Sequence, residues 1–79
     1  MNYVEMVERL VGREVNVMGF NDDTFEMEIQ RAKVITIIDG PEHDPQDYAI
    51  IERNGNEIGL PVSRLIASMD KAVEMGVAA

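Results

Sequence analysis

Residues 24–38 read TFEMEIQRAKVITII, and this stretch decides the fold class. In its first half, large apolar residues alternate with polar ones, as in a strand with one face towards the core: Phe25, Met27 and Ile29. Its second half, residues 34–38, is apolar or β-branched throughout, which is typical of a strand buried on both faces. One long strand bent at a bulge near residues 31–33 would join the halves, and two separate strands are the alternative.

Shorter strands are predicted on both sides of this stretch. Alternating valines indicate a strand over residues 14–20, and the Asn-Asp-Asp sequence at 21–23 favours a turn. Further along, residues 48–53 and 56–60 predict two strands. The Asn54-Gly55 pair between them is a strong signal for a tight hairpin.

A short helix is predicted before the first strand, because apolar residues recur there at helical spacing: Tyr3, Met6, Val7 and Leu10. Asn2 suits the N-cap of this helix, with Glu5 three residues later as in a capping box. Gly12 is the residue expected to end it in the left-handed conformation.

The C-terminal segment has two interpretations. In the favoured one, a helix runs from about Val62, with Pro61 at its first position and Gly76 past its end. In the other, a 3₁₀ turn at residues 61–64 precedes a short strand at 65–68 and a loose tail.

These elements predict a single α+β domain over residues 1–79. It consists of a helix at 1–12, a small, strongly bent antiparallel sheet or barrel at 14–60, and a C-terminal helix or tail at 61–79. This order of elements resembles the small SH3-like or Sm-like barrels. The resemblance implies RNA binding through polar and basic loops, but the loops of this chain are acidic: Asp22, Asp23, Asp39, Glu42, Asp44 and Asp47. We therefore expect the fold without the RNA binding.

Composition narrows the function. The 79 residues include fifteen acids, seven bases and no cysteine, a net charge of −8, which argues against disulfides, thiolate metal sites and contacts with nucleic acid or anionic lipid. One histidine, no cysteine and no phosphate-binding glycine loop leave no catalytic set, so we expect no enzyme and no cofactor. The first residues, MNYVEM, lack the basic region of a secretory signal, and no apolar stretch approaches the ~20 residues of a membrane span. A cytoplasmic protein is expected.

The acidic loop at residues 39–47 is the one candidate metal site, through five side chains: Asp39, Glu42, His43, Asp44 and Asp47. Their spacing matches no EF-hand, and two prolines restrict wrapping around an ion. A solvated loop is therefore favoured over a cation site.

Charge is concentrated in the middle of the chain. Residues 22–57 hold ten acids and three bases, a net −7, while the flanks are nearly balanced. By charge and size this resembles the phage-encoded DNA-mimic inhibitors, which occupy the DNA-binding surface of a basic host protein such as the nucleoid protein HU. On that interpretation the partner-binding residues are six acids: Asp22, Asp23, Glu26, Glu28, Asp44 and Asp47.

Two further expectations concern partners. The alternative function is an Sm-like nucleic-acid-binding or structural oligomer, which requires seven scattered bases to converge: Arg9, Arg13, Arg31, Lys33, Arg53, Arg64 and Lys71. Separately, Met69 and Met75 lie in a C-terminal segment that so small a core hides poorly, so we expect a homodimer contact there.

Overall fold

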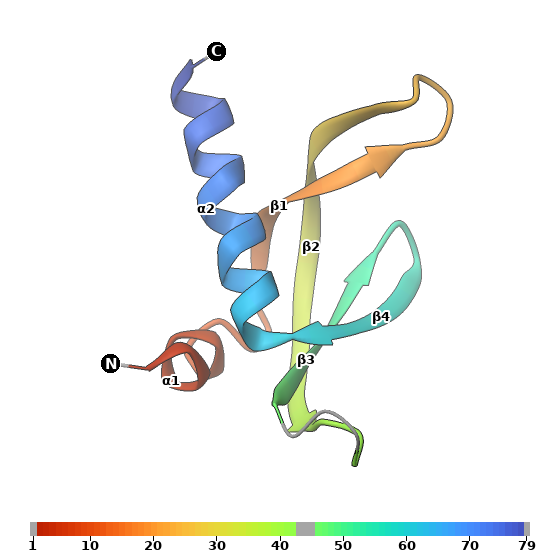
Figure 1. Cartoon of the computed structure of the whole chain (residues 1–79). Coiled ribbons are helices and arrows are strands. Elements are labelled where there is room, and N and C mark those ends of the chain that lie inside the picture. The colour runs from red at the N-terminus through yellow and green to blue at the C-terminus, as the bar shows by residue number, and fades with distance from the viewer. Residues whose placement is uncertain (1, 43–45, 79) are drawn as a thin grey trace.

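A computed structural model describes residues 2–42 and 46–78, with side chains up to residue 76. It contains four strands between two helices (Figure 1): α1 (Tyr3–Glu8), β1 (Glu14–Asn21), β2 (Glu26–Asp39), β3 (Asp47–Arg53), β4 (Asn56–Pro61) and α2 (Val62–Ala78). Each strand pairs antiparallel with the next, giving one sheet of order β1-β2-β3-β4. The predicted α+β class, with an antiparallel sheet between an N-terminal and a C-terminal helix, is confirmed.

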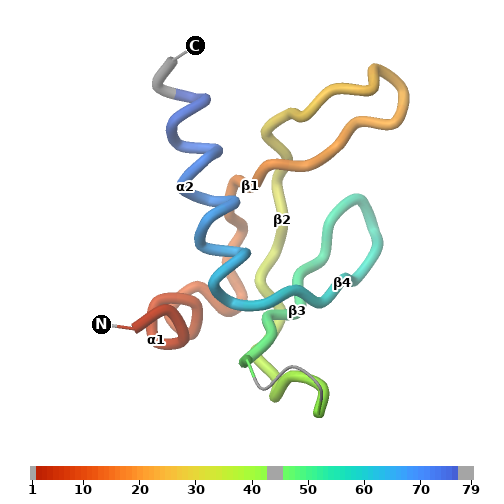
Figure 2. The backbone as a smooth tube through the Cα atoms, in the orientation of Figure 1, coloured from red at the N-terminus to blue at the C-terminus, as the bar shows by residue number. Residues whose placement is uncertain are grey.

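The sheet is open, not closed into a barrel. β1 and β4 are its two edges and do not pair with each other. In the backbone trace the β1–β2 hairpin and the β3–β4 hairpin diverge towards separate tips (Figure 2). The resemblance to SH3-like and Sm-like barrels stays a prediction.

β2 is one continuous strand, which decides between the two predicted alternatives. The predicted bulge near residues 31–33 is wrong, since β1 and β2 pair residue by residue from Glu14–Lys33 to Asn21–Glu26. The irregularity lies later, where the pairing of β2 with β3 shifts between Val34 and Thr36. Ile35 has no partner in β3 and is the extra residue of this bulge. It reverses the alternation of side chains along β2 at that point.

The prediction that Phe25, Met27 and Ile29 face the core is wrong: they are 79%, 55% and 41% exposed. The buried residues of β2 are Ala32 and Val34, at the opposite phase of the alternation. The apolar residues of the first half of β2 therefore lie on the face away from the core, and those of the second half lie partly on the core face. A period of two shows which residues share a face, but it does not show which face the helices cover.

α1 begins as predicted, with the Asn2 side chain accepting a hydrogen bond from the Glu5 amide at 2.9 Å. The helix ends earlier than predicted, at Glu8 with Arg9 as a right-handed C-cap, so Gly12 does not end it. Gly12 is left-handed, with a φ of +84°, and its amide donates to the Val34 carbonyl at 2.7 Å just before β1 begins. Only Val7 of the helix is buried. Tyr3 and Met6, which the periodicity assigned to the core face, are 53% and 36% exposed.

α2 confirms the helical interpretation of the C-terminal segment, starting at Val62. Two details differ, because Pro61 is the last residue of β4 and the helix continues through Gly76 to Ala78. Its buried face joins α1 and the sheet in one core cluster: Val7, Val17, Ala32, Val34, Ala49, Ile51, Val62, Leu65 and Ile66. Neither helix, over the residues described, is long and apolar enough to cross a membrane.

Candidate functional site

Four of the six predicted partner-binding acids lie together on the β1–β2 hairpin. We call them the hairpin acids: Asp22, Asp23, Glu26 and Glu28. Asp47 begins β3 opposite Asp39, at the other end of the long strand β2. Asp44 lies outside the described residues. The structure therefore assembles the acids near the tip of one hairpin and separates Asp47 from them.

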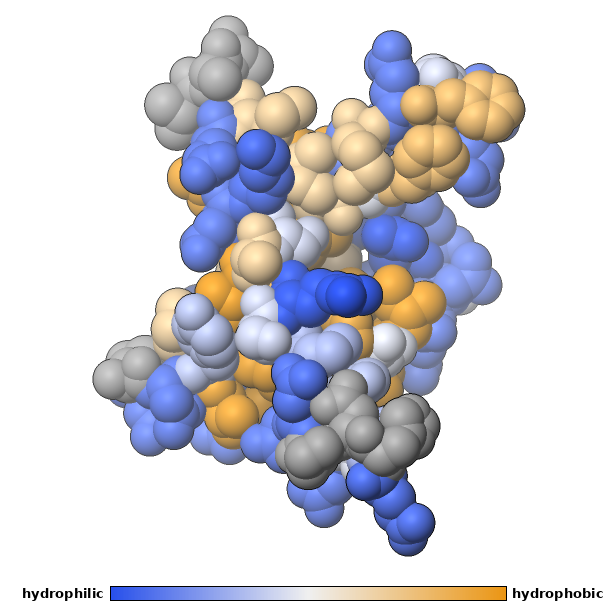
Figure 3. All heavy atoms as spheres, in the orientation of Figure 1, coloured by the Kyte–Doolittle hydropathy of each residue, from blue (hydrophilic) through white to orange (hydrophobic). Residues whose placement is uncertain are grey.

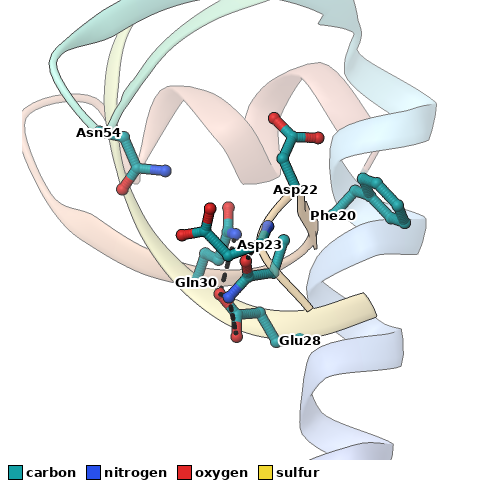
Figure 4. A pocket seen from close by; sticks show the side chains of 7 residues that line it. Phe20, Asp22, Asp23, Glu28, Gln30 and Asn54 are labelled. Atoms are coloured by element: carbon teal, nitrogen blue, oxygen red, sulfur yellow. Dashed lines mark hydrogen bonds between the residues drawn. The ribbon is translucent and has the colours of Figure 1, made fainter. Parts of the chain in front are cut away.

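A hollow of about 340 Å³ lies on this hairpin (Figure 4). Seven residues line it: Phe20, Asn21, Asp22, Asp23, Glu28, Gln30 and Asn54. Asn54 belongs to the β3–β4 turn and faces the side chains of the first hairpin across the hollow. The hollow is thus bordered by both hairpin tips, and carboxylate and amide groups dominate its lining.

Glu28 is held in place by two amide side chains. The Asn21 amide nitrogen lies 3.2 Å from each carboxylate oxygen of Glu28, and the Gln30 amide nitrogen donates to Oε1 at 3.2 Å. Asn21 and Glu28 can meet because Asn21 and Gly19 lie on the same sheet face as Glu26 and Glu28. These bonds fix the direction of the carboxylate and leave its negative charge unneutralised.

The same asparagine shapes the turn that carries Asp22 and Asp23. The Asn21 Oδ1 atom accepts hydrogen bonds from the amides of Asp23 at 2.9 Å and Thr24 at 3.3 Å. The Asn21 carbonyl accepts from the Phe25 amide at 2.8 Å, which closes the turn. Asn21 therefore organises both the turn and Glu28, as expected of a residue whose short side chain bonds its own backbone.

Gly19 and Gln30 belong to the site, although sequence analysis did not single them out. A Cβ atom added at Gly19 would collide with the Gln30 amide and lie 3.0 Å from the Arg53 guanidinium, so glycine allows these two side-chain ends to lie where they do. The Oε1 atom of Gln30 is buried with no hydrogen-bond partner among the described residues. The available signal was the glycine, which interrupts an otherwise regular strand.

Within residues 2–42 and 46–78, no ion pair joins a basic side chain to a hairpin acid. One base, Arg53, lies nearby, with its guanidinium beside Gly19, the cross-strand partner of Glu28. The ion pairs of that part of the chain lie elsewhere, between Arg31 and Glu14 at 3.1 Å and between Lys71 and Glu74 at 3.5 Å. All four hairpin acids are exposed. The hairpin consequently presents a concentrated negative charge to solvent.

The described residues contain no group of three or more acidic or histidine side chains placed to hold a metal ion. The three acids around the hollow do not converge, and Figure 4 shows the carboxylates of Asp22 and Glu28 directed to different sides of it. The acidic loop considered as a cation site includes residues 43–45, which lie outside the described part. Chemically, the hollow offers oxygen acceptors suited to ammonium and guanidinium groups.

Comparison with known proteins gives no relative, because no family model, no curated protein and no solved structure matches this chain.

Proposed function

We propose that this protein is a non-enzymatic interaction module of the cytoplasm whose hairpin acids bind a basic surface of another protein. In its most specific form it is a DNA-mimic inhibitor. The acids occupy the positions of DNA phosphates on a basic nucleic-acid-binding protein, such as the nucleoid protein HU, and thereby block DNA binding.

The observation that carries the proposal is the oriented carboxylate of Glu28, which makes no ion pair with a described residue, among the other hairpin acids. Asn21 and Gln30 hold its oxygens at 3.2 Å, and no Lys or Arg pairs with it in the described part of the chain. A carboxylate that is already oriented loses less conformational freedom when it meets a lysine or arginine. Oriented acids gathered on one hairpin are what a phosphate-binding surface would recognise.

Electrostatics also supports the choice of partner. With a net charge of −8, the chain attracts cationic proteins over long range and repels nucleic acid. Such an association depends on ionic strength, because salt screens charges more than about 10 Å apart at 0.1 M. The proposed complex should therefore form fastest and hold most tightly at low salt.

A displacement titration tests the specific form. Fluorescently labelled duplex DNA is bound to purified HU, and the protein is titrated in while fluorescence anisotropy is recorded. Release of the DNA is the expected result, and an Asp22→Asn, Asp23→Asn, Glu28→Gln triple variant should release much less. These amides keep the shape of the side chains while removing three negative charges.

The matched control removes three charges from other exposed positions, as Glu8→Gln, Glu42→Gln and Asp70→Asn. It should displace DNA nearly as well as the wild type. Equal losses in the two triple variants would show that only total charge matters. Binding of the labelled DNA by the protein itself would favour the Sm-like alternative.

A further inference from the structure

The opposite face of the β1–β2 hairpin is apolar and only partly covered by α2. In β1 and β2, Met18 lies opposite Ile29, and Phe20 lies opposite Met27, so these four side chains share one face. Phe20, Met27 and Ile29 are 41–55% exposed. Figure 3 shows apolar atoms continuing from the upper part of α2 across to the hairpin tip. We call this surface the apolar face.

α2 forms the other border of the apolar face. The Cδ1 atom of Ile29 lies 3.9 Å from where a Cβ on Gly76 would stand, so the hairpin approaches the helix there. Met75 follows Ser68 by seven residues and therefore lies on the same side of the helix, towards β1, where Ser68 bonds Met18. Met75 is 42% exposed. The apolar face thus spans three elements, β1, β2 and α2.

Phe25 projects from the tip of this hairpin in an unusual conformation. Its φ is +58°, a left-handed value that bulky residues rarely adopt, and its side chain is 79% exposed. Its ring packs edge-to-face against Phe20, with centroids 6.4 Å apart. Strained residues of this kind cluster where the chain makes functional contacts. The aromatic pair forms an apolar projection beside the apolar face.

The molecule exposes more surface than a compact chain of its size. Its accessible surface is 5517 Å², against about 4,800 Å² for a compact monomer of 8.9 kDa. Its radius of gyration is 12.7 Å, against about 11.6 Å for a compact chain of this length. Both projecting hairpins contribute to this excess of about 700 Å², which is of the same order as the ~800 Å² that each partner buries in a standard interface.

From these observations we infer that the apolar face binds a second copy of this chain, with Phe25 and Phe20 of each copy packing on the apolar face of the other. Each chain carries both the projection and the surface that receives it, as a two-fold symmetric contact requires. Glu26 and Glu28 project from the opposite sheet face, so the contact does not oppose them across the interface. An uncharged face is where two chains of charge −8 repel each other least.

Sedimentation equilibrium between about 1 and about 200 μM tests the contact, a range that covers ordinary weak homodimers. The wild type should shift from 8.9 kDa to twice that mass. Phe25→Asn should raise the dimer dissociation constant roughly 30-fold, as expected for a central aromatic contact. Asparagine is tolerated at a positive φ, so the hairpin fold is kept, which circular dichroism of the variant checks.

A matched pair on one strand gives a second, independent readout. Met27→Thr and Ile38→Thr both change an exposed residue on the same face of β2, but at opposite ends of it. Only Met27→Thr should weaken the dimer. A wild type that stays monomeric at the highest concentration would overturn the inference, and so would equal weakening by both variants or a dimer insensitive to Phe25→Asn.

Salt separates this inference from the proposed function. An apolar contact between two acidic chains should hold or tighten as sodium chloride rises, since salt screens their mutual repulsion. Binding of a basic protein by the hairpin acids should weaken under the same conditions. A negative result for the dimer therefore does not contradict the proposed binding of a basic protein, and the reverse also holds.

Discussion

The main-chain amide of Met18 donates to the hydroxyl of Ser68, 50 residues away, at 2.9 Å, and that hydroxyl lies 3.4 Å from the Met18 carbonyl. One side chain of α2 thus satisfies both main-chain groups of a residue on the free edge of β1. This contact ties the helix to the hairpin that carries the acids. It also covers part of an edge strand that could otherwise pair with other chains.

Replacing Ser68 with alanine should lower the free energy of unfolding by about 1–2 kcal/mol, because the Met18 amide is part-buried and loses its acceptor. Urea denaturation measures the change. Ser63→Ala is the control, since the Ser63 hydroxyl is exposed and its bond to Gln46 is 3.4 Å long. Equal effects of the two substitutions would mean that the Met18–Ser68 bond contributes nothing specific.

Gly19→Ala should weaken binding of a basic partner more than it lowers stability. The added Cβ would displace the Gln30 amide, which also bonds Glu28. Because the atoms it meets are the ends of the flexible Gln30 and Arg53 side chains, the loss of stability should stay below the roughly 1–3 kcal/mol typical of an overpacked core. A calorimetric scan and a binding titration of the variant measure the two effects, and unchanged binding would show that displacing Gln30 does not disturb Glu28.

Gly76→Ala should instead stabilise the protein. Gly76 lies within α2, and an added Cβ would meet only Ile29 Cδ1 at 3.9 Å, an ordinary contact. Alanine in a helix is favoured over glycine by up to about 1 kcal/mol. The melting temperature should rise in a calorimetric scan, and a fall would place Gly76 in a tighter environment than the structure shows.

Asn21→Ala tests whether orientation of Glu28 matters for binding. The variant keeps every charge but removes both contacts to the Glu28 carboxylate and the two turn bonds. Binding of a basic partner should weaken roughly fivefold, the equivalent of about 1 kcal/mol. Asn16→Ala, at an exposed position on the other face of β1, should leave binding unchanged in the same isothermal titration.

Local signals in the sequence were sufficient for the helix starts and the second hairpin. Asn2 caps α1, and Asn54 and Gly55 have φ values of +55° and +81°, as the left-handed turn of an Asn-Gly hairpin requires. These features depend on a few neighbouring residues, whose chemistry restricts the backbone directly. The predicted helix from Val62 followed from periodicity of the same local kind.

The apolar face of the hairpin could not be predicted in this way. The alternation at Phe25, Met27 and Ile29 is real, but the direction of the core is set by Ala32 and Val34 and by where α2 packs. That packing is a long-range choice which a period of two does not encode. Large apolar residues were assigned to the core because burial is the commoner outcome.

The candidate site was predicted in part. Charge density pointed to Asp22, Asp23, Glu26 and Glu28, which the structure places on one hairpin. It also pointed to Asp47, which pairs with Asp39 at the far end of β2. The 14 residues of this strand separate Asp47 from the hairpin acids. The amides that hold Glu28 depend on cross-strand register, which only the structure provides.

The most direct test of the central claim is a pull-down from bacterial lysate at low salt, with the wild type and the Asp22→Asn, Asp23→Asn, Glu28→Gln variant as parallel baits. The wild type should retain a basic DNA-binding protein that elutes with sodium chloride and that added duplex DNA displaces, while the variant should not. Identical retention by both baits, or a partner indifferent to salt and DNA, would contradict the assignment of the hairpin acids as a DNA-mimic surface.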